Sequence, residues 1–152
     1  MSEYPELKLE NQLCFRIYTL QRKVMALYKP LLDELGITYM QYITLMVLWS
    51  DGTQKVSDIC LKTDIDVGTI SPMLKRMEKN NLIIRSRDES DERVVKVSLT
   101  VKGEEMKQDA RRVPHSLMSC FSPNVNVANN QEMESIANLL DTLIDSVQAC
   151  NN

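Results

Sequence analysis

The sequence predicts a mainly α-helical fold with one small β-hairpin. Apolar residues recur at steps of three and four along most of the 152-residue chain, which is the period of an amphipathic helix. Two short β-prone runs, 82–87 and 94–99, are separated by the charged turn 88–92 and predict the hairpin. With 43% hydrophobic and 26% charged residues, the composition is that of an ordinary globular protein. We therefore expect a single domain over residues 1–152.

Two helices are expected before the hairpin region. Residues 7–35 carry an apolar side chain at every third or fourth position, and Gly36 ends this pattern. Pro30 falls inside the pattern and is expected to bend or break the helix, because proline removes a backbone donor. Thr38 can cap the next helix, which runs to the turn at 51–52. This second helix is apolar on almost every side, so we expect it to be buried between neighbours.

The middle of the chain predicts a helix-turn-helix. A short helix at 55–62 is followed by a polar turn and by a second helix that starts at Gly68 or Thr69 and ends at Asn80. This start places Pro72 in the first turn, where the missing N–H has no helical partner to lose. Together with the hairpin that follows, residues 37–100 then form a winged helix-turn-helix.

Two further helices are expected after the hairpin. Thr100 can cap one that runs to about Phe121, and a loop at 122–130 separates it from a terminal helix with an apolar stripe. Such a stripe usually packs against another surface. We expect the helices of residues 1–36 and 101–152 to form the interface of a homodimer.

This order of elements suits double-stranded DNA, since an α-helix fits the major groove. The net charge of −3 means that DNA binding has to be local rather than a result of bulk positive charge. The helix before the hairpin is expected to direct its N-terminal residues to base edges and its basic residues to phosphates. The candidates are Thr69, Ser71 and Pro72 for the bases, and Lys75 and Arg76 for the phosphates.

The hairpin tip offers a second candidate contact with DNA. Arg93 follows Asp91 by two residues, so both side chains are expected on one face of the strand. The aspartate can hold the arginine extended, and the arginine can then enter the narrow minor groove, where the negative potential is concentrated. The alternative is that both charges only solvate the tip.

Composition disfavours several other classes of protein. His115 is the only histidine, which makes a catalytic triad or a multi-histidine metal site difficult to build from one subunit. The four glycines stand apart and form no phosphate-binding loop. We therefore expect that the protein binds no metal and no cofactor and is not an enzyme. Without a signal peptide, a membrane span or a paired-cysteine motif, the chain is expected to stay in the cytoplasm and to carry no structural disulfide framework.

Several stretches resemble the MarR family of transcriptional repressors, and the resemblance covers nearly the whole chain. The DNA-binding half carries it in residues 68–78, 82–83 and 88–95. The N-terminal half, in residues 13–15, 28–32 and 35–42, resembles the OhrR-like organic hydroperoxide sensor subgroup. The resemblance implies a homodimeric repressor that releases a pseudo-palindromic operator when an organic hydroperoxide oxidises it.

That resemblance implies a sensing role for Cys14. In the subgroup a cysteine at this place is oxidised to a sulfenic acid; tyrosines matching Tyr28 and Tyr39 hydrogen-bond the sulfur, and Tyr18 matches a tyrosine lining the pocket. Fourteen residues of helix span about 21 Å, so Tyr28 has to approach Cys14 from another subunit. Without the resemblance, Cys14 would be interpreted as a small buried hydrophobic residue.

Three routes remain open for the oxidised thiol. Two-cysteine members of the subgroup carry a resolving cysteine near the end of the long helix after the wing, which Cys120 matches. The fuller pattern has a further cysteine one turn later, where this chain has Asn124. Cys150 or a small cellular thiol are the other routes, whereas Cys60 is expected to pack in the core.

Two other functions fit parts of the sequence. The first is a MarR-type repressor released by a small lipophilic or phenolic ligand, with Cys14 only lining the ligand cleft. The second is a thiol peroxidase that uses Cys14 catalytically, for which a recognition helix and a wing would have no purpose.

Overall fold

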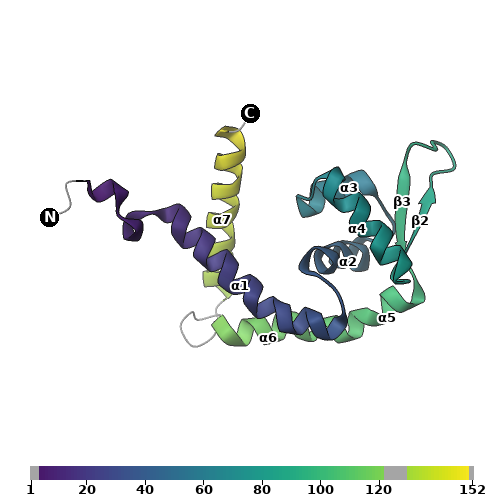
Figure 1. Cartoon of the computed structure of the whole chain (residues 1–152), viewed down its shortest axis with the longest axis horizontal. Helices are drawn as coiled ribbons and strands as arrows, with labels where there is room; N and C mark the ends of the chain where they lie inside the picture. Colours follow the sequence, from purple (N-terminus) through teal and green to yellow (C-terminus); the bar gives the residue numbers. More distant parts are fainter. Residues whose placement is uncertain (1–3, 122–129, 151–152) are drawn as a thin grey trace. The chain divides into compact units, whose positions relative to one another are not determined.

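The structure, a computed structural model, describes residues 4–121 and 130–150. The chain divides into two compact units, residues 1–113 and 114–152, and the first contains the helix-turn-helix and the sheet (Figure 1). In chain order the elements are η1 (Pro5–Leu7), η2 (Leu9–Asn11), α1 (Leu13–Leu35), α2 (Tyr39–Asp51), β1 (Gln54–Lys55), α3 (Val56–Thr63), α4 (Val67–Lys79), β2 (Ile83–Arg87), β3 (Val95–Leu99), α5 (Val101–Ala110), α6 (Arg112–Phe121) and α7 (Asn130–Cys150).

The first long helix is shorter than its apolar pattern predicts. The two short 3-10 segments η1 and η2 occupy the start of the pattern, and α1 itself begins at Leu13. Of the two outcomes expected at Pro30, a break does not occur, because the turns on both sides continue the helix. The helix ends at Gly36, whose φ of 68° is the left-handed conformation that suits glycine.

The buried helix α2 confirms the prediction made for the second element. The Thr38 side chain accepts a hydrogen bond from the Gln41 backbone N–H, and the Gln41 side chain accepts one from the Thr38 N–H at 2.9 Å. This capping box satisfies two of the donors that open a helix. Further along α2, Thr44, Leu45 and Leu48 are at most 1% exposed, so the helix forms the centre of the first unit.

The helix-turn-helix consists of α3 and α4, and α4 starts earlier than expected. Asp66 caps it by accepting the Thr69 backbone N–H at 2.9 Å, which sets the first helical residue at Val67. Pro72 is therefore the sixth residue of α4, and its expected place in the first turn is wrong. Its missing N–H leaves the Gly68 carbonyl without the usual helical donor.

The wing is a small antiparallel sheet with the strand order β1-β3-β2. Strands β2 and β3 agree with the predicted hairpin to within one residue, and Arg85 pairs with Val97 in their register. The two-residue strand β1, which pairs with the other edge of β3, was not predicted. Helix α4 packs beside β2, so α4 and the wing lie side by side (Figure 1).

A joint of hydrogen bonds connects the end of α4, the wing and α5. The Thr100 hydroxyl donates to the Asn81 carbonyl at 2.6 Å, and the Trp49 indole N–H donates to the Gly103 carbonyl at 2.9 Å. A Cβ atom on Gly103 would lie 2.1 Å from the Leu82 carbonyl oxygen. Only glycine allows the backbones to approach this closely.

The single helix expected to run from Thr100 to about Phe121 is two helices. Thr100 does cap α5, by accepting the Gly103 N–H at 3.0 Å, but α5 ends at Ala110 and α6 begins at Arg112. The loop expected next falls on 122–129, outside the described residues. Helix α7 carries exposed apolar side chains along its length, and no described helix is long and apolar enough to cross a membrane.

Candidate functional site

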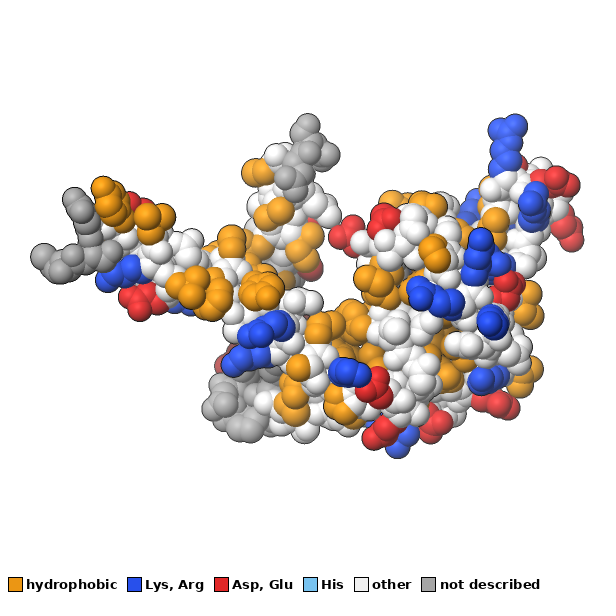
Figure 2. Space-filling model, in the orientation of Figure 1, with side chains coloured by type: hydrophobic (Ala, Val, Ile, Leu, Met, Phe, Trp, Pro, Cys, Tyr) orange, Lys and Arg blue, Asp and Glu red, His pale blue; other side chains and the backbone are white. Residues whose placement is uncertain are grey.

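The predicted DNA-contacting residues of α4 lie together on its outer face. The inner face, with Ile70, Met73, Leu74 and Met77, is at most 4% exposed and packs into the core. In Figure 2, Lys and Arg side chains are spread over the helix-turn-helix and the wing, with acidic side chains among them. Of the predicted contacts, Thr69, Pro72, Lys75 and Arg76 are exposed and Ser71 is half-buried.

The two hydroxyl groups at the start of α4 are already engaged as donors. The Thr69 hydroxyl donates to an Asp66 carboxylate oxygen at 2.6 Å, and this hydrogen bond is the main cause that lowers the pKa of Asp66. The Ser71 hydroxyl donates to the Val67 carbonyl at 2.8 Å. In this arrangement, what Thr69 and Ser71 offer to a DNA base is an acceptor lone pair.

Arg93 is exposed to solvent at the wing tip, but Asp91 does not hold its side chain as expected. The Asp91 carboxylate accepts the Arg93 backbone N–H at 3.0 Å, and among the described ion pairs none joins the two side chains. Both residues precede β3, which begins at Val95, so their expected position on a strand is wrong. Asp91 therefore shapes the turn, and the guanidinium of Arg93 is left exposed.

An ion pair fixes the base of the same turn. The Asp88 carboxylate contacts the Lys96 ammonium group and accepts the Ser90 backbone N–H at 2.8 Å. Lys96 is the main cause that holds the pKa of Asp88 well below its usual range, and Asp88 in turn raises the pKa of Lys96. The turn that carries Arg93 is thus anchored to strand β3 by the contact between Asp88 and Lys96.

A groove of about 390 Å³ runs between the helix-turn-helix and the wing. Its apolar floor includes Leu74 and Val95, and its polar lining includes Ser71 from α4 and Arg93 from the turn. Arg85 of β2 also lines it and pairs with Glu78 of α4 at 2.6 Å. Sequence reasoning missed both partners, because seven residues and a turn separate them.

Cys14 lies in the first turn of α1 and is exposed, with a free thiol. One turn later, Tyr18 is 59% exposed, and the Arg22 guanidinium lies 5.9 Å from the centre of its ring. The neighbouring apolar side chains on this part of α1 are exposed as well, among them Leu13, Phe15 and Ile17. Within one chain, Cys14 is therefore not a buried hydrophobic residue.

The other two predicted sensor tyrosines contact each other. The ring centres of Tyr28 and Tyr39 are 4.8 Å apart in an edge-on arrangement, and Tyr42 follows at 6.1 Å from Tyr28. Burial raises the pKa of Tyr28, with Tyr39 and Tyr42 adding to the effect, so at neutral pH its hydroxyl keeps its proton and can donate. Tyr42 is only 3% exposed, which places it in the core.

One chain does not bring the thiol and the tyrosines together. Helix α1 is continuous from Leu13 to Leu35 and carries both Cys14 and Tyr28. At 1.5 Å per residue, the fourteen residues between them span about 21 Å. The predicted sensor residues thus form two separate groups on each chain, Cys14 with Tyr18 and Tyr28 with Tyr39.

The remaining cysteines differ in their surroundings. Cys60 is half-buried in α3, and burial is the main cause that raises the pKa of its thiol. Cys120 in α6 is exposed and donates to the Ser116 carbonyl at 3.6 Å, and Cys150 is exposed at the end of α7. All four thiols are free, and the described residues contain no group of three or more potential metal ligands. Asn124, the place of a further cysteine in the fuller pattern, lies outside the described residues.

A larger groove of about 1040 Å³ opens between α1, α2 and α4. Its walls are partly apolar, with Met25 and Met73, and Tyr39 also lines it. Arg76 and Lys79 of α4 add positive charge. The groove is thus large enough for a small aromatic or lipophilic molecule.

Comparisons with known proteins agree on one class. Residues 26–110 match the family described as "Transcriptional regulator SarA/Rot". The "Organic hydroperoxide resistance transcriptional regulator" of Bacillus subtilis is 38% identical over 150 residues, covering 99% of both chains. Reduced AbfR bound to DNA, a Staphylococcus epidermidis protein, has a TM-score of 0.78 at 29% identity, covering 97% of this chain and 99% of that one. Disulfide-formed AbfR has a TM-score of 0.64 at 32% identity, with coverage of 91% and 94%.

Proposed function

The chain belongs to the SarA/Rot family of transcriptional regulators, and from this premise we propose that it is a DNA-binding repressor released by oxidation of Cys14. The resemblance to the organic hydroperoxide sensor subgroup is confirmed by its relative from Bacillus subtilis. The observation that carries the proposal is the exposed, free Cys14 on the same unbroken helix as the paired tyrosine Tyr28. AbfR, solved in reduced, DNA-bound and disulfide forms, supports it.

In the proposed complex, α4 enters the major groove of double-stranded operator DNA. Thr69, Ser71 and Pro72 face the bases, and Lys75 and Arg76 face the phosphates. Arg93 reaches the minor groove from the wing tip. A homodimer presents two such heads related by a two-fold axis, so the operator is pseudo-palindromic.

The sensor site is proposed to form between two copies of the chain. Cys14 of one copy contacts Tyr28 and Tyr39 of the other. Contact across the dimer is needed because Cys14 and Tyr28 of the same helix are about 21 Å apart. Exposed apolar side chains on α1 and α7 provide surface for such a contact. We assign residues 1–36 and 101–152 to dimerisation and residues 37–100 to DNA binding.

The proposed chemistry is oxidation of a thiolate by an organic hydroperoxide. The Cys14 sulfur attacks one peroxide oxygen, an S–O bond forms as the O–O bond breaks, and an alcohol leaves after protonation. A second thiol then displaces water from the sulfenic acid and forms a disulfide. Cys120, Cys150 or a small cellular thiol can fill this role. The change breaks the tyrosine contacts and shifts the helices that set the spacing of the two heads.

No metal or cofactor takes part in this proposal, and each oxidation consumes one hydroperoxide without turnover by the protein alone. We expect the protein to act in the cytoplasm, where small thiols return it to the reduced form.

The proposed function is tested by selecting a binding duplex from a random DNA pool with the reduced protein. We expect a pseudo-palindromic sequence, a protein dimer in the complex by sedimentation, and loss of binding after one equivalent of cumene hydroperoxide. A pool without enrichment, or a monomer on a non-repeated sequence, would count against the proposal.

Replacing Arg93 by alanine is expected to weaken binding to the selected duplex about tenfold. The exposed guanidinium contributes its minor-groove contact, so the slope of log affinity against log salt should also fall by about 1 for each half-site. Fluorescence anisotropy at several salt concentrations measures both quantities. Unchanged affinity and slope would favour the alternative that the charges at the wing tip are only solvated.

Replacing Tyr28 by phenylalanine is expected to slow oxidation of Cys14 about tenfold, because the thiolate loses a hydrogen bond of roughly 1.5 kcal/mol. The rate is measured from the loss of DNA binding after addition of hydroperoxide. Mixing Tyr28→Phe with Cys14→Ser subunits provides the control, since each mixed dimer regains one intact site. Fast oxidation should return in the mixture; if it does not, the site lies within one subunit.

A second candidate function rests on the larger groove between α1, α2 and α4. Its volume of about 1040 Å³ and its mixed apolar and cationic lining suit a small phenolic or lipophilic inducer. In that case Cys14 has no chemical role. Release of DNA by an unreactive aromatic acid, undiminished in the Cys14→Ser protein, would favour this function.

A further inference from the structure

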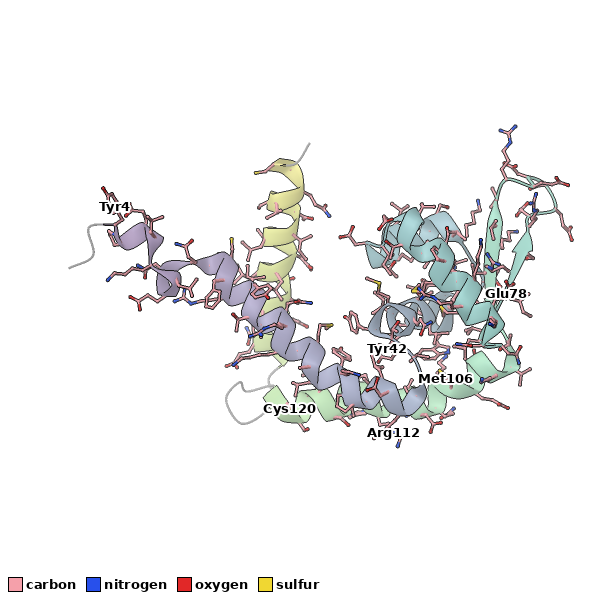
Figure 3. All side chains as sticks on the ribbon, in the orientation of Figure 1. Tyr4, Tyr42, Glu78, Met106, Arg112 and Cys120 are labelled. Atoms are coloured by element: carbon pink, nitrogen blue, oxygen red, sulfur yellow. The ribbon has the colours of Figure 1, made fainter. Side chains whose placement is uncertain are left out.

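Glu78 in the last turn of α4 binds Arg85 in the middle of β2 through both carboxylate oxygens. Oε1 accepts the Arg85 backbone N–H at 3.1 Å, and Oε2 accepts Nε at 3.0 Å and Nη2 at 2.6 Å. The side chains of the pair are 37% and 27% exposed, and Glu78 lies where α4 meets the wing (Figure 3). The contact therefore ties the recognition helix directly to a wing strand.

The position of β2 explains why a backbone donor is available to Glu78. In the order β1-β3-β2, this strand pairs with β3 on one side only. The Arg85 N–H points away from β3 and would otherwise belong to a free strand edge. The carboxylate thus takes the place of a further strand at this point, and it fixes the edge to α4 rather than to solvent.

The ion pair with Glu78 also fixes the guanidinium of Arg85, a positive charge that lines the groove between α4 and the wing. Arg85 lines that groove together with Lys55 and Arg93. The guanidinium of Arg85 lowers the pKa of Glu78, so the carboxylate stays charged at neutral pH. As long as Glu78 is charged, Arg85 is held at the base of the wing and is not free to bind a phosphate.

We propose that Glu78 is a positioning residue, which sets the wing at the angle to α4 that lets Arg93 reach the minor groove. This inference rests on the proposed DNA-binding function. Arg93 lies in the turn that joins β2 to β3, so any rotation of β2 against α4 moves its guanidinium. Glu78 itself needs no contact with DNA for this role.

For the substitution Glu78→Gln, the proposal and simple electrostatics predict changes in DNA affinity of opposite sign. Glu78→Gln removes a negative charge from the DNA-binding unit, and by charge alone this would strengthen binding to the polyanion. A positioning role predicts weaker sequence-specific binding instead, because the charged hydrogen bonds that hold Arg85 are lost. We expect a loss of about tenfold.

The test is a double-mutant cycle with Glu78→Gln and Arg93→Ala, measured by anisotropy on the duplex that the wild-type protein selects. We expect Glu78→Gln to weaken binding about tenfold in the wild-type background and less than twofold when Arg93 is already alanine. Asp64→Asn is the matched control, since it removes one exposed carboxylate from the turn between α3 and α4. It should leave specific binding equal or slightly stronger.

Equal losses in both backgrounds, or a gain on Glu78→Gln, would overturn the proposal. Urea unfolding measures the stability of each variant, and Arg85→Lys replaces Glu78→Gln if the latter does not fold. Lysine keeps the charge but cannot donate the same pair of side-chain hydrogen bonds, so the same coupling with Arg93 is expected. Failure of the wild-type protein to select any duplex would instead refute the proposed function.

Discussion

Replacing Cys14 by serine is expected to leave DNA affinity within about twofold of the wild type and to abolish release by organic hydroperoxide. Serine is close to cysteine in size, and the Cys14 side chain is exposed on each chain, so the fold should not change. A hydroxyl does not form a sulfenic acid, so the oxidation step is lost altogether. Anisotropy of a labelled duplex before and after one equivalent of cumene hydroperoxide measures both effects.

Two matched substitutions separate this effect from general loss of a thiol. Cys60→Ser and Cys150→Ser should each still be released, because the half-buried Cys60 has a raised pKa and Cys150 is not the primary site of attack. Cys120→Ser should still be oxidised, and its product reveals whether Cys120 forms the disulfide. Full release of the Cys14→Ser protein would exclude the sensing role and favour the ligand-binding alternative.

Replacing Gly103 by alanine is expected to lower the free energy of unfolding by about 3 kcal/mol. The new Cβ atom would lie 2.1 Å from the Leu82 carbonyl oxygen and 3.2 Å from a methyl carbon of Leu99. A backbone oxygen cannot move aside as a flexible side chain can, so the joint between α4, the wing and α5 has to open. Urea unfolding followed by the fluorescence of the single tryptophan, Trp49, reports on this joint directly.

Gly36→Ala provides the control for Gly103→Ala. Gly36 has a φ of 68° but open space around its Cβ position, so alanine there bears only the conformational penalty of about 1 kcal/mol. The two variants differ in crowding and not in the chemical change. Because Gly103 lies inside α5 and has no positive φ, unchanged or increased stability of Gly103→Ala would show that close approach at Gly103 does not matter.

The elements that the sequence predicts well are those set by local chemistry. The caps at Thr38 and Thr100 and the glycine stop at Gly36 each depend on a few adjacent residues. The wing strands follow from β-prone runs on either side of a charged turn. Helix order, strand order within the hairpin and the outer face of α4 could therefore be predicted.

Most of the wrong predictions arose where a second local signal was stronger than the one on which the prediction relied. The apolar period continues through η1 and η2, so periodicity alone does not reveal that α1 begins at Leu13. Asp66 is a better N-cap than the residues beside Gly68, and its hydrogen bonds start α4 at Val67, one or two residues earlier than expected. Asp91 binds a backbone N–H rather than a guanidinium because an aspartate in a turn readily bonds the chain two residues on.

The features that were not predicted at all depend on contacts between residues far apart in the sequence. The hydrogen bond from Trp49 to Gly103 crosses 54 residues, and the pairing of Glu78 with Arg85 depends on how the chain reverses after α4. The sensor site is harder still, since Cys14 and its tyrosines are predicted to meet only between two copies. Sequence identified those residues by resemblance, and the fold of one chain places them apart.

The most direct test of the account is an electrophoretic mobility shift with the wild-type protein on its selected duplex. The complex is formed with reduced protein, treated with stoichiometric cumene hydroperoxide, and then treated with dithiothreitol. We predict that the complex is lost on oxidation and returns on reduction, as a reversible thiol switch requires. A complex that is indifferent to the hydroperoxide would contradict the account and leave Cys14 without a sensing role.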